Sequence, residues 1–153
     1  MTIFIAGHET TANALTWTFY LLSQNPDIEK KLHDEIDSVA LGTSNDSSNS
    51  GIRIRLPAAD NDIIPKLQYT EKVLRESMRV YPPVWTIGRH VDKDYSVGEY
   101  TIPAAGSSLI MSRYVMHHDP RYYDQPEQFN PDRWTEEFKA HLPKFSYFPL
   151  GGE

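Results

Sequence analysis

The chain has 153 residues and a net charge of −6, and 39% of its residues are hydrophobic. This length and composition predict one modest domain with a packed core. The acidic balance and the lack of any basic run argue against a nucleic-acid partner. The sequence contains no cysteine, which excludes disulfides, cysteine-ligated zinc and a cysteine nucleophile within these residues. Composition does not assign a cellular compartment.

The amino-terminal segment, residues 1–22, is rich in Ile, Phe, Ala, Leu and Trp and predicts a helix from Thr2 to Ser23. It does not resemble a signal peptide, because it has no basic leader and because His8 and Glu9 interrupt the apolar run. The same polar side chains argue against a membrane span. We therefore expect this segment to be a buried core helix.

Within this helix, residues 6–11 read Ala-Gly-His-Glu-Thr-Thr, and several of them disfavour a buried helix. Gly7 costs about 1 kcal/mol relative to Ala in a helix interior. A buried Glu9 costs several kcal/mol, to an order of magnitude, unless it is partnered or protonated. The hydroxyls of Thr10 and Thr11 compete for carbonyls one turn back. Such a run of locally unfavourable residues indicates a functional site.

A second helix is predicted after Asn25, which is the expected N-cap, with Pro26 at the first helical position. Its apolar positions recur at helical spacing, and we interpret the charged residues between them as a solvent-exposed face. The apolar positions are Ile28, Leu32, Ile36 and Val39. Residues 41–51 are low in hydrophobicity and predict a mobile loop.

A third helix is predicted over roughly Gln68 to Tyr81 and ends at the double proline, residues 82–83. Its apolar stripe is expected at Leu67, Leu74, Met78 and Tyr81. Three short strands then follow, separated by turns. They are Val84–Val91, Ser96–Ile102 and Ser107–Ser112.

The segment from His117 to Trp134 has no clear period and predicts an ordered loop held by aromatic side chains, or a short helix around Pro120 to Asp124. With three helices followed by short strands, the predicted fold class is mainly α with a small β region, that is, α+β.

Three further patterns invite a chemical interpretation. Glu76 and Arg79 are three residues apart on one helix face, and most such pairs are exposed and contribute less than about 1 kcal/mol. Adjacent histidines such as His117 and His118 point to opposite sides of an extended segment, which argues against a shared metal ion. A zincin pattern beginning at His8 fails because Ala12 stands where the second histidine is needed.

Together and in this order, these segments resemble the cytochrome P-450 family, the haem-thiolate monooxygenases. Residues 6–11 match that family's oxygen-activation motif, and residues 76–79 match its Glu-x-x-Arg helix. Residues 129–134 match its Pro-x-Arg-aromatic segment. Residues 117–120 fall where the family has His-Arg-Asp-Pro, and residues 148–152 look like the approach to the haem-binding loop. The resemblance covers essentially the whole chain.

The resemblance implies a haem cofactor, bound by the intact protein through a cysteine thiolate that this chain lacks, so that no metal ligand lies within these residues. It implies that Glu9 feeds protons toward dioxygen and that the Thr10 hydroxyl holds oxygen and water. Ala6 and Gly7 would line the cofactor side of the helix, where their small size lets dioxygen approach the backbone. Arg89 would bind a haem propionate, which suits a bidentate guanidinium.

The resemblance also implies a substrate pocket and a structural network. The residues bordering the pocket would be Ile3, Phe4, Val84, Trp85 and Ile87. Glu76, Arg79 and Arg133 would form a buried network, and removing one member would cost about 3–5 kcal/mol because an unpaired charge would remain.

We therefore interpret residues 1–153 as a partial P-450 haem domain, running from the central helix to the start of the haem-binding loop. The intact enzyme would insert one atom of dioxygen into a lipophilic substrate, with electrons from a reductase or ferredoxin, and the fragment alone would be inactive. Two alternatives stay open: a truncated or decayed non-catalytic chain, and a haem-free module that binds metal through His117 and His118.

Overall fold

A computed structural model describes residues 2–41, 63–104 and 106–150 of the chain. It confirms the predicted fold class, since helices dominate and the strands form two small antiparallel sheets. In chain order the elements are α1 (Thr2–Gln24), α2 (Pro26–Leu41), η1 (Ile64–Lys66), α3 (Gln68–Val80), β1 (Thr86–His90), β2 (Tyr95–Val97), β3 (Tyr100–Ile102), β4 (Ser108–Ser112), α4 (Arg113–His117), η2 (Pro131–Arg133) and α5 (Glu136–His141).

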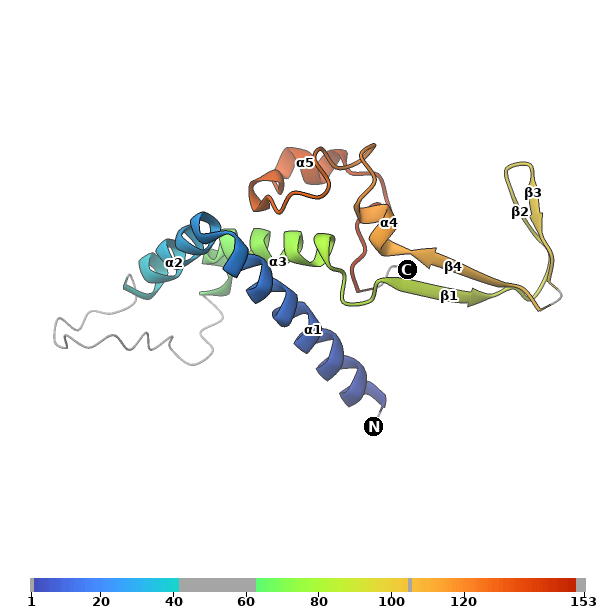
Figure 1. Ribbon diagram of the computed structural model, residues 1–153, viewed down its shortest axis with the longest axis horizontal. Helices are drawn as coiled ribbons and strands as arrows, with labels where there is room; N and C mark the ends of the chain where they lie inside the picture. The colour runs from blue at the N-terminus through green and yellow to red at the C-terminus, as the bar shows by residue number, and fades with distance from the viewer. Residues whose placement is uncertain (1, 42–62, 105, 151–153) are drawn as a thin grey trace.

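Helix α3 lies at the centre of the molecule, with α1 and α2 on one side and the segment from α4 to α5 on the other (Figure 1). Strands β1 and β4 form an arm that leads away from α3, and the β2–β3 hairpin lies at its far end. The hydrophobic core is small and lies where α1, α2 and α3 meet. It comprises Leu21, Leu22, Leu32, Tyr69, Val73, Val80 and Phe129.

The expectation that the whole first helix is buried is wrong for its amino-terminal half. Ile3 is 90% exposed and Phe4 is 76% exposed, whereas Thr18, Leu21 and Leu22 are buried. The reason is geometric, because the buried residues of α1 lie in its carboxyl-terminal turns, which pack against α3, whereas its first turns extend away from the other helices (Figure 1). Among the described residues, no helix is long and apolar enough to span a membrane.

The buried turns of α1 carry both polar and aromatic contacts to α3. The hydroxyl oxygens of Thr18 and Ser77 lie 2.8 Å apart in the buried contact between the two helices. Trp17 stacks on Tyr81, with ring centroids 4.3 Å apart. Buried hydroxyls need a hydrogen-bond partner, so this pair fixes the facing turns of the two helices.

The predicted apolar stripe of α3 is only partly correct. Leu74 is exposed, and the buried positions of α3 are instead Tyr69, Val73, Glu76, Ser77, Arg79 and Val80. The buried face is therefore half polar, and a periodicity based on apolar residues alone misplaces it.

Glu35, on the predicted solvent-exposed face of α2, has a structural role. The Glu35 carboxylate accepts hydrogen bonds from the backbone amides of Tyr69 (2.6 Å) and Thr70 (2.8 Å). These amides lie in the first turn of α3, so Glu35 supplies the cap that no side chain of α3 provides. The side chain of Asn25, the expected N-cap of α2, donates to the Leu21 carbonyl at 2.7 Å.

The β region differs from prediction in one strand. The middle segment folds as a hairpin in which Tyr95 pairs with Ile102 and Val97 with Tyr100. The turn contains Gly98 with φ of 60°, a conformation that glycine adopts without steric cost. Strands β1 and β4 pair antiparallel over Thr86–His90 and Ser108–Ser112.

Between β4 and the end of the described chain, two short helices escaped prediction. Helix α4 follows β4 directly, and Ser112 caps it by accepting from the Val115 amide. Helix α5 is capped by Thr135 in the same way. Residues 119–130 form turns, as the loop interpretation expected, and not a helix. The predicted mobile loop, residues 41–51, begins at the last residue of α2 and otherwise lies outside the described residues.

Candidate functional site

The Glu76 carboxylate, which has no exposed surface, accepts hydrogen bonds from five donor groups. Oε1 accepts from Arg79 Nη2 (2.9 Å), Arg133 Nε (2.9 Å) and the Asn130 amide (3.0 Å). Oε2 accepts from Arg79 Nε (3.0 Å) and Trp134 Nε1 (2.9 Å). A carboxylate offers about four lone-pair sites, so its acceptor capacity is filled.

The two arginines use their remaining N–H groups on backbone carbonyls. Arg79 donates through Nη1 to the His117 carbonyl (2.8 Å) and through Nη2 to the Gln128 carbonyl (3.1 Å). Arg133 donates through Nη1 to the Asp124 carbonyl (2.7 Å). These bonds fasten the irregular segment after α4 to α3, and they satisfy carbonyls that no regular secondary structure would pair.

The structure thus brings together Glu76, Arg79 and Arg133, whereas the pair considered alone was expected to be exposed. Sequence analysis did not assign Trp134 or Asn130 to this cluster. The sequence did point to them, because Trp134 and Asn130 belong to the same six-residue segment as Arg133, and a buried indole N–H needs an acceptor.

The exposed half of α1 carries the residues predicted for oxygen chemistry. The Thr10 hydroxyl donates to the Ala6 carbonyl one turn back, at 2.8 Å, and Glu9 is exposed. At Gly7, an added Cβ would meet nothing within 4 Å, so the backbone there is open. The helix is continuous through this run, because the Thr10 bond follows the helix and does not interrupt it.

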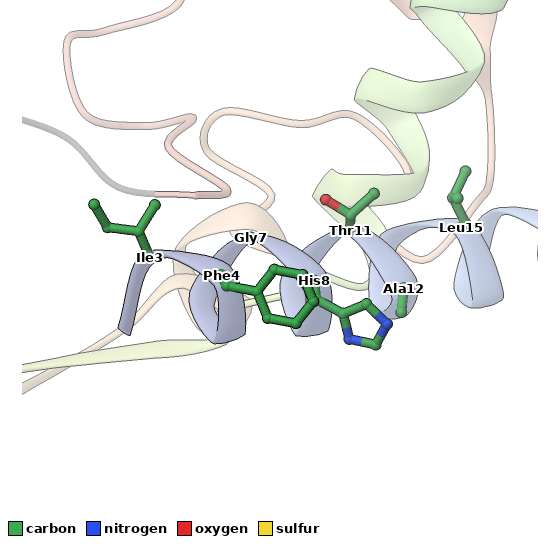
Figure 2. A pocket seen from close by; sticks show the side chains of 7 residues that line it. All are labelled: Ile3, Phe4, Gly7, His8, Thr11, Ala12 and Leu15. Atoms are coloured by element: carbon green, nitrogen blue, oxygen red, sulfur yellow. The ribbon is translucent and has the colours of Figure 1, made fainter. Parts of the chain in front are cut away.

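A shallow apolar groove of about 570 Å³ follows this half of α1. Figure 2 shows Ile3, Thr11 and Leu15 on one side of the helix and the rings of Phe4 and His8 on the other. The residues lining it are Ile3, Phe4, Gly7, His8, Thr11, Ala12 and Leu15. Three of these are among the predicted cofactor and substrate residues.

The other predicted pocket residues are not in that groove. Trp85 is 64% exposed, and Val84 and Ile87 are half-buried. Arg89 is exposed on β1, where its Nη1 donates to the carbonyl of Gly88 at 3.0 Å. The predicted catalytic, cofactor and pocket residues therefore fall into two groups, one on α1 and one on β1 and the turn before it.

His117 is a buried titratable residue that sequence analysis weighed only as a metal ligand. Burial lowers its pKa from 6.5 to about 4. The neighbouring positive charge of Arg79 and the His118 ring act in the same direction, while the backbone groups of Arg79 and Met78 near the ring partly oppose them. The ring is therefore neutral at pH 7, and it stacks on Tyr147.

The model of the cytochrome P-450 family matches residues 1–152 of the chain. The chain belongs to the cytochrome P-450 family. It is 38% identical over 152 residues to cyclooctatin synthase from Streptomyces melanosporofaciens, which covers 99% of this chain and 30% of that protein. It is 40% identical over 156 residues to the Arabidopsis thaliana protein LUTEIN DEFICIENT 5, covering 99% of this chain and 24% of that protein.

A further relative, cyclooctat-9-en-7-ol 5-monooxygenase from the same Streptomyces species, is 34% identical over 151 residues, 99% of this chain and 30% of that protein. The chain thus spans between 24% and 30% of the length of these three curated relatives.

Cytochrome P-450 proteins bind haem, a flat apolar ring edged by carboxylates. The residues of this chain fit two parts of that group. The groove on α1 is apolar and open at Gly7, and Arg89 is an exposed guanidinium suited to a carboxylate. The iron ligand of haem-thiolate proteins is a cysteine, and the sequence contains none.

The metal-binding alternative gains no support from the described part of the chain. No group of three or more His, Asp or Glu side chains there could hold a metal ion. His117 Nε2 already accepts a hydrogen bond from the Phe148 amide, at 3.1 Å, and His118 Nδ1 lies 2.8 Å from the Tyr114 carbonyl.

Replacing Glu76 with Ala should lower the free energy of unfolding by about 3–5 kcal/mol, because two buried guanidinium groups lose their counter-charge. Urea unfolding followed by circular dichroism measures this. The matched control is Glu71→Gln, which breaks the exposed Glu71–Arg75 pair (2.7 Å) on the same helix. That change should cost less than about 1 kcal/mol. Equal losses in the two variants would contradict a special role for the buried network.

Stability should fall as the pH falls from about 6.5 to about 4, by roughly 2–3 kcal/mol attributable to His117. In this window the unfolded chain binds the proton and the folded chain does not, so the proton favours unfolding. Urea unfolding from pH 4 to pH 7, compared between the unchanged chain and His117→Gln, isolates this contribution. If the free energy of unfolding changes equally with pH in both proteins, His117 does not cause the loss of stability.

Proposed function

We propose that the intact protein containing this chain is a haem-thiolate monooxygenase. It inserts one atom of dioxygen into a lipophilic organic substrate and releases the other atom as water. The reaction consumes two protons and two electrons, and a reductase or ferredoxin supplies the electrons. Family membership supports the reaction class, and the arrangement of Glu9 and Thr10 supports the assignment of roles within this chain.

The observation that carries the proposal is the location of Glu9 and Thr10 on the half of α1 that no other described element covers. A hydroxyl whose proton is engaged by the Ala6 carbonyl presents its oxygen lone pairs outward. Thr10 can therefore accept a hydrogen bond from a water molecule and hold it in place. Glu9, on the same turn, is an exposed acid that can exchange protons with solvent.

When bound, haem supplies the activation of dioxygen by reduction, with a cysteine thiolate as the iron ligand in this family. The residues of this chain would hold and surround it. Arg89 binds a propionate as a bidentate donor. Ala6 and Gly7 have little or no side chain, which leaves space at the helix surface for dioxygen to approach. Water held by Thr10 passes on protons that originate at Glu9.

The substrate contacts are proposed for Ile3 and Phe4 on α1 and for Val84, Trp85 and Ile87 around β1. Their side chains are apolar, and the first two line the groove on α1. Such surfaces recognise a substrate mainly by burial of its apolar area, which favours a lipophilic compound.

Glu76, Arg79 and Arg133 are proposed as a structural network without a chemical role. Each charged group in it is neutralised or hydrogen-bonded inside the protein. It holds the segment between α4 and α5 against α3, and so fixes the part of the chain that leads to the end of the described structure.

In the intact protein, Thr10→Ala should lower product formed per dioxygen consumed by at least about tenfold, with the balance released as hydrogen peroxide, because proton delivery contributes about 10²–10⁴ in rate. Product, peroxide and oxygen consumption measured together give this ratio. Thr16→Ala is the matched control, since Thr16 makes the same 2.8 Å bond one turn back, to Ala12. If Thr16→Ala lowers the ratio as much, the loss reflects helix stability and the role of Thr10 is wrong.

The 153-residue chain alone should have no monooxygenase activity, because it has no cysteine to ligate the iron. When the chain is mixed with haem, reduced and exposed to carbon monoxide, we expect no thiolate-type absorption band. The intact protein should give that band under the same conditions. A thiolate-type band from the 153 residues would refute the prediction, and its absence from the intact protein would favour the decayed, non-catalytic alternative.

A further inference from the structure

Two side chains of α4 hold the backbone just before the end of the described chain. Arg113 is the first residue of α4 and His117 is the last, four positions apart, so they lie on one helix face. The described part of the chain ends beside α4 and the segment that leads into β1. The backbone that the two side chains hold is that of Phe148 and Pro149.

Arg113 is a buried cation that joins two segments. Its side chain is 2% exposed, and Nη1 donates to the Val84 carbonyl (2.9 Å) and the Pro149 carbonyl (3.2 Å). The guanidinium carbon lies 5.4 Å from the centroid of the Phe148 ring, a cation–π distance. Arg113 thus ties the chain that leaves α3 to the chain that ends the described structure.

His117 holds the same segment through its ring. It has no exposed surface, and its Nε2 accepts a hydrogen bond from the Phe148 amide at 3.1 Å. Since an accepting nitrogen carries no proton, the neutral ring must carry its proton on Nδ1. The ring stacks on Tyr147, with centroids 5.3 Å apart.

Both side chains retain an unsatisfied polar atom. Among the buried side-chain nitrogens and oxygens of the described residues, only Arg113 Nε and His117 Nδ1 lack a hydrogen-bond partner. An unpaired buried donor is destabilising, so stability alone does not account for these residues. The bonds that they do make converge on two consecutive residues, Phe148 and Pro149.

His117 also connects this contact to the buried carboxylate. Its backbone carbonyl accepts from Arg79 Nη1, at 2.8 Å, and Arg79 is bonded to Glu76. His117 is therefore bonded to Arg79 of the buried network through its backbone carbonyl, and to the Phe148 amide through its ring.

We propose that Arg113 and His117 are positioning residues, which fix the backbone of Phe148 and Pro149 with His117 as the neutral Nδ1–H tautomer. That this placement of the backbone serves haem binding rests on the proposed function, whereas the contact itself is a property of this chain.

The tautomer is tested first, by nuclear magnetic resonance of the ¹⁵N-labelled 153-residue chain at pH 7. We expect the His117 Nε2 signal at the position of an unprotonated ring nitrogen and the Nδ1 signal at that of a protonated one. A protonated Nε2, or an imidazolium, overturns the proposal, because neither can accept from Phe148.

The second test is amide hydrogen exchange at Phe148 in three variants. His117→Leu removes the acceptor, and exchange should accelerate at least tenfold. His117→Gln places an oxygen the same number of bonds from the backbone, and exchange should stay within threefold of the unchanged chain. His118→Leu, the matched control, alters a ring bonded within its own helix and should leave Phe148 unaffected.

A purely structural role would give a different pattern. If His117→Leu accelerates exchange equally at Val73 in α3, or if His117→Gln behaves as His117→Leu does, the proposal is overturned. If His117→Leu fails to fold, the Phe148 exchange rate in His117→Gln and the tautomer of the unchanged chain still test the proposal.

For Arg113, the carbonyl ¹³C shifts of Val84 and Pro149 should move in Arg113→Met and stay in place in Arg121→Met, whose guanidinium is exposed and bonded to Asp119. No movement in Arg113→Met overturns the Arg113 assignment. Lack of haem binding by the intact protein would defeat the proposed function and leave all these results unchanged.

Discussion

A carboxylate away from water is stable only where opposite charge and hydrogen-bond donors surround it. Glu76 meets this condition with Arg79, Arg133 and Trp134, and its partners come from two parts of the chain. The segment between α4 and α5 is mostly irregular, so its carbonyls need donors from outside. The arginines of this cluster supply them, and the arrangement of that segment on α3 therefore depends on one buried carboxylate.

From Glu76, a continuous path of contacts reaches the end of the described chain. Arg79 bonds to the carbonyl of His117, and the His117 ring accepts from Phe148. The centroid of the Tyr123 ring lies 5.2 Å from the guanidinium carbon of Arg79. The Tyr123 hydroxyl donates a hydrogen bond to the carbonyl of Ser146, two residues before Phe148. Glu76 is thus connected to residues 146–149 through packed and hydrogen-bonded groups.

The sequence predicted the three long helices and the fold class because the spacing of apolar residues and the prolines that bound helices are local properties. Apolar periodicity alone could not locate the buried face of α3, because Glu76, Ser77 and Arg79 are buried by partners distant in sequence. Only the family resemblance indicated that Glu76 and Arg79 are buried. The prediction merged β2 and β3, although Gly98 marks the turn. The motif residues Glu9 and Thr10 were recognisable, since a polar run within an apolar helix is visible without a structure.

The two halves of helix α1 have different roles, since only the carboxyl-terminal half packs in the core. Its last turns are buried against α3 through Thr18, Leu21 and Leu22, and these contacts fix the axis of the helix. Its first turns, with Gly7, are largely exposed, so they contribute little to the core. Gly7 and Thr10, which would pack poorly in a core, therefore cost little core packing at these positions. The buried half of α1 holds them in a defined direction.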